Sequence, residues 1–216
     1  MKRENWQKGV EAFRSVHFKK HEKDFLELVE KGQNPKALFI GCSDSRVLPN
    51  LITSTGPGDL FIVRNVGNMV PPYKPDNDFH ATAAGIEYAV NHLKVGEIIV
   101  CGHSDCGACK ALYEDHSGHE EDMIHTVKWL ELGMPAKELA LKSVIDGDSA
   151  ELQEATEKFS VIFQLKNLLT YPYVKKRVDA GELFLHGWYY RIDSGEVECY
   201  DPVEEKFVSL KEVTKE

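Results

Sequence analysis

Short apolar runs alternate with longer helical segments in the middle of this chain, and that alternation limits the fold more than any other feature. Residues 37–42, 60–64 and 97–101 are too short for stable helices, and the first run lacks polar alternation, which is typical of a strand buried on both faces. Residues 79–94 carry several apolar side chains, stop before a glycine and are expected to form a long helix. The pattern predicts an α/β fold with a mostly parallel central sheet flanked by helices.

The N-terminal part is predicted to be a helical arm, residues 1–34. One face of its first helix carries four large side chains: Trp6, Val10, Phe13 and His17. A second helix is expected over residues 21–31, because Gly32 follows as a helix stop. The apolar stripe of the first helix is expected to cover another surface.

The remaining chain, residues 35–216, is predicted to form the α/β core of one single domain. Residues 120–180 are expected to be helical with two interruptions, and residues 183–190 to form a strand. A tight turn then leads into residues 197–200, which predicts an antiparallel hairpin at the C-terminal end. We find no internal repeat and no Gly/Ser linker.

The charge is acidic and concentrated in one window. The chain has 26 Lys and Arg against 35 Asp and Glu, a net charge of −9, which argues against a nucleic-acid or membrane partner. Residues 114–157 hold twelve acidic residues and three lysines, which accounts for the whole excess. We interpret this window as a solvated helical surface with no catalytic role; an acidic docking surface is the alternative.

Apolar stretches and the number of cysteines indicate the cellular location and the cysteine chemistry. No stretch reaches the roughly 18 consecutive apolar residues of a spanning helix, and residues 1–18 show no secretory signal. A cytoplasmic protein is therefore expected. Five cysteines are an odd number for a disulfide framework, so they favour metal or thiol chemistry.

Residue types that bind metals follow the first and third predicted strands. Cys42 and Asp44 come after one, and His103 and Cys106 after the other. Open α/β sheets place ligand sites at the carboxyl ends of their strands. Two thiolates, an imidazole and a carboxylate suit Zn²⁺, so a zinc site is predicted here. Residues 102–105 are expected to cap a helix that starts near Cys106.

The two clusters together resemble the zinc signature of the β-class carbonic anhydrases. Cys-Ser-Asp-Ser-Arg at 42–46 is followed by Gly-His-Ser-x-Cys-Gly at 102–107. The resemblance covers residues 33–113 and includes Arg-Asn-Val-Gly-Asn at 64–68 and Gly-Ile-Glu-Tyr-Ala-Val at 85–90. It implies a zinc enzyme that reversibly hydrates CO₂ to bicarbonate and a proton.

The resemblance also implies roles for individual residues. Cys42, His103 and Cys106 would bind one Zn²⁺ per subunit, with Asp44 and Arg46 as the catalytic dyad beside it. In the family's open state Asp44 pairs with Arg46 and leaves the fourth zinc position to water or hydroxide. In the closed state Asp44 becomes the fourth ligand. Arg46 competes with the metal because it offers the carboxylate a bidentate partner.

The pocket residues point to one branch of that family. Phe39 stands where the regulated bacterial branch has a tryptophan, so the resemblance is to the plant-like, open-site branch. The substrate pocket that this implies consists of Gln33, Phe61, Val66, Tyr88 and Gly107. Zinc lowers the pKa of bound water from about 15.7 to about 7, and zinc-bound hydroxide would attack CO₂ between apolar walls.

The family also implies an oligomer. Its site lies at a dimer interface, and the N-terminal helix of one subunit lies across its neighbour. The stripe of Trp6, Val10 and Phe13 fits that role, although such a stripe packs on its own domain at least as often. We expect a homodimer or a dimer of dimers, with CO₂ and bicarbonate as ligands.

Other functions remain open at this point. The spacing of Cys101, Cys106 and Cys109 matches three ligands of a plant-type iron–sulfur centre, but the only later cysteine is Cys199. Cys106 and Cys109 also resemble a thioredoxin-like redox pair. A carbon disulfide hydrolase and a non-catalytic zinc protein of the same fold are the remaining alternatives.

Overall fold

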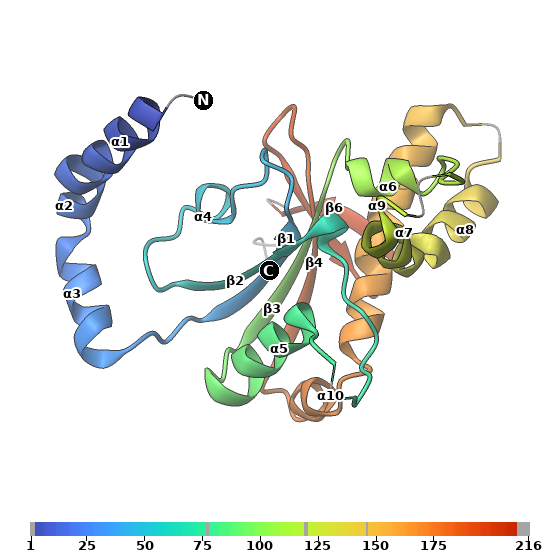
Figure 1. Ribbon diagram of the computed structural model, residues 1–216. Helices are drawn as coiled ribbons and strands as arrows, with labels where there is room; N and C mark the ends of the chain where they lie inside the picture. Colours follow the sequence, from blue (N-terminus) through green and yellow to red (C-terminus); the bar gives the residue numbers. More distant parts are fainter. Residues whose placement is uncertain (1–2, 77, 119–120, 146, 211–216) are drawn as a thin grey trace.

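A six-stranded sheet forms the centre of the molecule in the computed structural model, which describes residues 3–76, 78–118, 121–145 and 147–210 (Figure 1). Its strands lie in the order β2-β1-β3-β4-β5-β6; β1 to β4 are parallel, and β5 and β6 are antiparallel. Their bounds are β1 Ala37–Cys42, β2 Leu60–Asn65, β3 Glu97–His103, β4 Phe184–Tyr190, β5 Val197–Asp201 and β6 Lys206–Ser209. The predicted fold class is confirmed, and β6 is an addition to the predicted hairpin.

Helices connect the parallel strands and cover the sheet. They are α4 Pro49–Ile52, α5 Ala81–Glu87, α6 Gly107–Ala111, α7 Ile124–Leu130, α8 Met134–Ser143, α9 Ser149–Leu168 and α10 Pro172–Asp179. Three short helical segments accompany them: η2 Val66–Asn68, η3 Tyr88–His92 and η4 Glu131–Gly133. Together α5 and η3 confirm the predicted long helix, which is shorter at both ends. Among the described residues, no helix has the length and apolar character needed to cross a bilayer.

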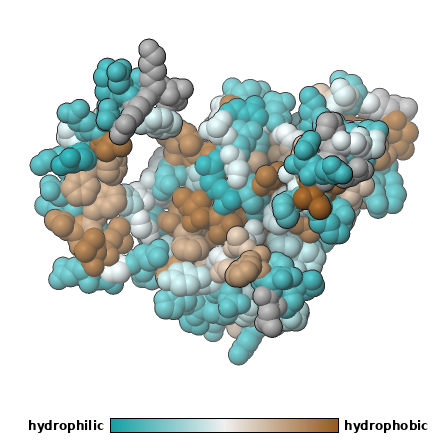
Figure 2. Space-filling model, viewed as in Figure 1, coloured by the Kyte–Doolittle hydropathy of each residue, from teal (hydrophilic) through white to brown (hydrophobic). Residues whose placement is uncertain are grey.

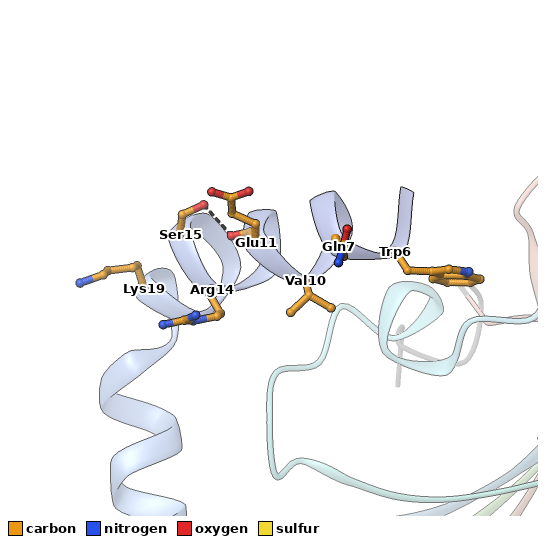
Figure 3. Close-up of a pocket in the computed structure, with 7 residues that line it drawn as sticks. All are labelled: Trp6, Gln7, Val10, Glu11, Arg14, Ser15 and Lys19. Carbon is orange, nitrogen blue, oxygen red and sulfur yellow. Dashed lines mark hydrogen bonds between the residues drawn. The ribbon is translucent and has the colours of Figure 1, made fainter. Parts of the chain in front are cut away.

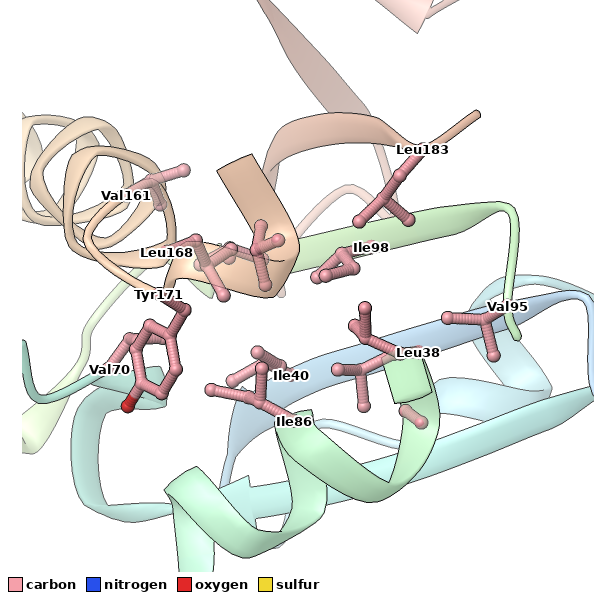
Figure 4. Packing of buried hydrophobic residues seen from close by; sticks show 14 residues of the cluster. Leu38, Ile40, Val70, Ile86, Val95, Ile98, Val161, Leu168, Tyr171 and Leu183 are labelled. Atoms are coloured by element: carbon pink, nitrogen blue, oxygen red, sulfur yellow. The ribbon is translucent and has the colours of Figure 1, made fainter. Parts of the chain in front are cut away.

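The largest buried cluster lies between one face of the sheet and the helices α5, α9 and α10 (Figure 4). Leu38 and Ile40 of β1 point into it, whereas Phe39 points to the other face and contacts Trp188 edge-on. Every residue of β1 is buried. The apolar run therefore forms a strand covered on both faces, as predicted.

Two glycines let α9 lie unusually close to the sheet. A methyl group added at Gly102 of β3 would come within 2.6 Å of the Val161 side chain on α9, and one at Gly187 of β4 within 2.9 Å of Val161 and Leu165. Larger residues at either position would push the helix outward. The start of α9 is fixed by the Asp148 carboxylate, which accepts hydrogen bonds from the amides of Ala150 and Glu151.

The N-terminal helices form an arm that stands apart from the sheet (Figure 1). The arm consists of α1 Arg3–Ala12, η1 Phe13–His17, α2 Phe18–Lys20 and α3 Glu22–Lys31. Trp6 and Val10 are more than 60% exposed and lie on the side of α1 opposite Glu11 and Ser15 (Figure 3). Apolar surface is visible both on the arm and on the body beside it (Figure 2). The predicted stripe therefore forms, and it is left uncovered within the single chain.

One local expectation is wrong. Strand β3 continues through His103, which pairs with Tyr190, so only Ser104 and Asp105 remain for the turn before α6. Asp105 enters the left-handed region at φ +56°, and Cys106 itself occupies the N-cap position without a side-chain cap. The pairing of β3 with β4 explains why residues 102–105 do not cap the helix.

Candidate metal centre

The carboxyl ends of β1 and β3 bring three metal-binding side chains together. Cys42 ends β1 and His103 ends the adjacent β3, while Cys106 follows three residues after His103, at the start of α6. All three side chains are buried, and their donor atoms lie within 4.8 Å of one another. Neither Cys101, Cys109 nor Cys199 belongs to this group. The set contains the nitrogen and sulfur ligands that Zn²⁺ prefers.

The His103 ring is oriented as a metal ligand would be. Its Nδ1 lies 2.8 Å from the backbone oxygen of Ser104, which can accept a hydrogen bond only if Nδ1 carries the proton. Its Nε2 is buried and has no hydrogen-bond partner among the residues that the structure describes. An unpaired buried nitrogen is costly unless something binds its lone pair, and a cation held by two cysteines would do so. The residues therefore fit a zinc ion.

The two thiols influence each other's ionisation. The Cys106 thiol and the nearby His103 ring lower the pKa of Cys42 to about 4. The thiols of Cys109 and Cys42 raise the pKa of Cys106. Two sulfurs at this separation share one negative charge, because a second would be repelled. A divalent cation between them removes that repulsion and allows both to ionise.

Asp44 and Arg46 form a bidentate pair beside the cluster. Oδ1 of Asp44 accepts hydrogen bonds from the Arg46 amide at 2.9 Å and Nε at 3.0 Å, and Oδ2 accepts one from Nη2 at 2.7 Å. These bonds from Arg46 hold the pKa of Asp44 well below its usual range. The carboxylate is therefore ionised and turned toward Arg46.

Two arginines also hold the backbone around the cluster. Nη2 of Arg46 donates to the backbone oxygen of Asp105 at 3.0 Å, which links the Cys42 loop to the Cys106 loop. Arg64 of β2 donates from Nε to the backbone oxygen of Cys42 and from Nη2 to that of Asp44, at 2.9 and 2.6 Å. The backbone of the loop that follows Cys42 is thus fixed from the neighbouring strand.

Comparison with known proteins decides the family. A family model described as carbonic anhydrase matches residues 37–197, which include both loops. A carbonic anhydrase of Synechocystis sp. is 43% identical over 201 residues, covering 93% of this chain and 72% of the relative. The solved structure of the β-carbonic anhydrase CcaA superposes with a TM-score of 0.88 at 42% identity, covering 95% of this chain and 91% of the other. This chain belongs to the β-class carbonic anhydrases.

Similarity within the carbonic anhydrases also extends over the arm. A carbonic anhydrase of Helicobacter pylori is 36% identical over 214 residues, covering 96% of this chain and 97% of the relative. One of two tetrameric β-carbonic anhydrases from Sordaria macrospora has a TM-score of 0.70 at 32% identity, covering 91% of this chain and 92% of the other. The family is the one that the two sequence motifs resemble.

The predicted pocket residues of this carbonic anhydrase fall into two groups. Val66 and Gly107 lie next to the cluster, because Asn65 pairs with Cys42 and Gly107 follows Cys106. Gly107 is exposed, and a methyl group there would meet open space. The cluster therefore has an open side at the start of α6.

Gln33, Phe61 and Tyr88 lie elsewhere in the same chain. Phe61 pairs with Leu38, four residues and so about 13 Å along the strand from Cys42, and its ring contacts that of Tyr88. Gln33 lines a groove of about 500 Å³ between α3 and the turn before β2. These three side chains do not border the cluster of their own chain.

The arrangement of the thiols does not favour the iron–sulfur alternative. Cys101 is fully buried inside β3, where burial raises its thiol pKa to about 12, and Cys199 lies in β5, two strands away from β3. An iron–sulfur centre would need these thiols beside Cys106. The carbonic anhydrase motif, in contrast, uses the residues that the fold brings together.

One residue in the acidic window corrects our interpretation of that window. Glu157, expected on a solvated surface, is only 2% exposed, and its carboxylate accepts a hydrogen bond from the Cys106 amide at 2.8 Å. The composition of the window concealed it, because one face of α9 packs against the sheet while the other faces solvent. Glu120 and Asp146 of the same window lie outside the described residues. No sequence signal short of the helix register identifies Glu157.

Proposed function

We propose that Cys42, His103 and Cys106 bind one Zn²⁺ and that this carbonic anhydrase uses it to hydrate CO₂ to bicarbonate. The observation that carries the proposal is the buried Nε2 of His103, which has no hydrogen-bond partner in the described part of the chain and belongs to a group of donor atoms, with two cysteine sulfurs, that lie within 4.8 Å of one another. When bound, Zn²⁺ lowers the pKa of a water molecule to about 7 and so supplies hydroxide at neutral pH.

Asp44 orients the attacking oxygen in this proposal. Its Oδ1 accepts two hydrogen bonds from Arg46 and its Oδ2 only one, which leaves a lone pair on Oδ2 for a hydroxyl hydrogen. Because Arg46 holds the carboxylate by two side-chain bonds, Asp44 is kept from turning toward the metal ligands. The pair corresponds to the open state of the family, in which Asp44 would not be a ligand of the metal.

The uncharged substrate approaches across an apolar surface. Val66 is 44% exposed beside the cluster and provides one wall, and Gly107 leaves space on the opposite loop. A nonpolar wall favours CO₂ over charged competitors, because an ion would lose its hydration there. Bicarbonate, once formed, is driven back toward water for the same reason.

We propose that the remaining pocket residues come from a second copy of the chain. Gln33, Phe61 and Tyr88 lie away from their own cluster, yet the family resemblance assigns them to the pocket. The exposed stripe on the arm supports this, since a chain seldom leaves a tryptophan and a valine uncovered on one helix face. The proposed assembly is a homodimer or a dimer of dimers of single-domain subunits, and a cytoplasmic location stays a prediction.

Stopped-flow measurement of CO₂ hydration tests the activity, with zinc content measured on the same sample. We expect about one zinc per chain and catalysis that Asp44→Asn reduces strongly. A rate no faster than buffer at pH 8.5 with zinc bound would favour a non-catalytic zinc protein. Release of sulfide from carbon disulfide, without CO₂ hydration, would favour a carbon disulfide hydrolase. Light scattering tests the assembly, and a sharp monomer mass would contradict it.

A further inference from the structure

We infer that Glu157 is a positioning residue for the metal centre: from helix α9 it fixes the backbone of the ligand Cys106. The inference rests on the proposed zinc site and adds a residue to it that lies far outside both sequence motifs. Oε1 of Glu157 accepts a hydrogen bond from the Cys106 amide at 2.8 Å. Both groups are buried.

Helix α9 holds the peptide groups on both sides of the Cys106 side chain. Gln153, one turn before Glu157, donates from Nε2 to the backbone oxygen of Cys106 at 3.1 Å and to Oε1 of Glu157 at 2.7 Å. The amide and the carbonyl of Cys106 are therefore both bonded to α9. With its backbone held at two points, the cysteine has only its own side-chain rotation left to direct Sγ.

A third residue holds the carboxylate in place. The Tyr189 hydroxyl donates to Oε2 of Glu157 at 2.7 Å, and Tyr189 is 1% exposed in β4. A buried carboxylate is expensive to keep, and three donors compensate for the lost hydration. An apolar residue at this position would pack without the cost of removing a charge from water. The presence of a carboxylate therefore indicates a role other than packing.

The segment around Cys106 has little local structure to fix its backbone. Asp105 lies in the left-handed region at φ +56°, and the helix that follows, α6, has five residues and no side-chain cap. A short uncapped helix after a strained residue is a weak support for a metal ligand. Glu157 takes the amide that a capping side chain would otherwise take.

The packing of α9 on the sheet places the carboxylate at that amide. Gly102 lies next to His103 and lets Val161, one turn after Glu157, come against the strand. On the same helix, Glu154 points to Arg191 and Lys158 instead of the cluster. Glu154 and Glu157 are thus acidic residues three positions apart with different surroundings, so a substitution of Glu154 is a matched control for one of Glu157.

The test compares Glu157→Ala, Glu157→Gln and Glu154→Ala in the full chain loaded with Zn²⁺ or Co²⁺. Glutamine can accept the bonds from Cys106 and Gln153 through Oε1 and donate from Nε2 to the Tyr189 oxygen, so it preserves the geometry without the charge. We expect Glu157→Ala to weaken metal binding and lower kcat about 10- to 100-fold, the usual range for residues that orient a ligand. It should also change the sulfur-to-cobalt absorption. Glu157→Gln should stay close to the parent chain in all three.

Several outcomes decide the matter. An unchanged cobalt spectrum and metal affinity in Glu157→Ala would overturn the inference, as would equal damage from Glu157→Gln, which would assign the effect to charge. The same losses in Glu154→Ala would contradict a specific role of Glu157 and would assign the effect to the stability of α9. If Glu157→Ala does not fold, Gln153→Ala, which removes the bond to the Cys106 carbonyl, should give a several-fold effect of the same kind, and no effect would contradict us. A parent chain that binds neither metal would instead refute the zinc proposal itself.

Discussion

The two loops that carry the proposed metal ligands are held in different ways. In the first, Asp44 bonds to Arg46 two residues away, and the arginine side chain is 45% exposed. In the second, Cys106 is 1% exposed and bonds to Gln153 and Glu157, about fifty positions later in the chain. The Asp44 side chain of the first loop is oriented by a local pair near the surface, whereas the backbone of Cys106 in the second loop is held by burial against a distant helix.

This difference matters for chemistry and for stability. An exposed ion pair contributes little to folding, so the pairing of Asp44 with Arg46 acts mainly on the orientation of one carboxylate. A buried carboxylate with three donors is tied to the packing of α9, and its loss disturbs the structure around the ligand. Substitutions in the two loops should therefore fail in different ways.

The largest effect is expected where the two loops act as one, at the ligands themselves. Cys42→Ser and Cys106→Ser should each lose most bound zinc and more than about 10³-fold of kcat/KM, because both sulfurs hold the same ion. Zinc content and stopped-flow hydration measure this. Full zinc occupancy in either variant would break the symmetry between the loops and remove that residue from the ligand set.

Arg46→Ala should give the next largest effect, and one without unfolding. The freed Asp44 carboxylate can turn toward the metal, so we expect kcat to fall about 10²-fold while zinc stays bound and the melting temperature changes little. Arg46→Lys should recover only part, since an ammonium group cannot form the two parallel bonds. A large drop in melting temperature would contradict the view that this exposed pair acts mainly on the orientation of Asp44.

Gly102→Ala should affect the second loop through packing. The new methyl group would lie 2.6 Å from Val161, and relieving the clash moves α9 and is expected to cost about 1–3 kcal/mol in the free energy of unfolding. Metal affinity should fall with it, because Glu157 moves too. Gly96→Ala is the control, since a methyl group there meets nothing within 4 Å. Equal melting curves for the two variants would argue against tight packing of α9.

Cys109→Ala should have the smallest effect. Its thiol is buried near Cys106 but lies outside the ligand group, so zinc content and kcat/KM should remain within about two-fold of the parent chain, as for a small volume change. Loss of zinc would make Cys109 a participant in the second loop and would reopen the redox interpretation of the two cysteines.

Much of the fold could be predicted from short patterns. The apolar run 37–42 is a buried strand, because six apolar residues are too short for a stable helix and lack the polar alternation of a half-exposed strand. Gly32 ends a helix, as its position suggests. The cap before α6 could not be predicted, since the pairing of His103 with Tyr190 depends on a strand more than eighty residues later. Local patterns report local preferences and nothing about such pairings.

The sequence by itself determined the alternation of strands and helices and the two motifs with their proposed ligand and dyad residues. Each of these is a property of neighbouring residues, so spacing and residue type are enough to identify it. Only the tertiary structure decided that Glu157 is buried against Cys106 instead of lying on the acidic surface, and that Arg64 holds the backbone of Cys42. It also decided that Gln33, Phe61 and Tyr88 lie away from the cluster of their own chain. Those contacts depend on how a helix and a strand pack across the sheet, and packing joins residues that no short pattern relates.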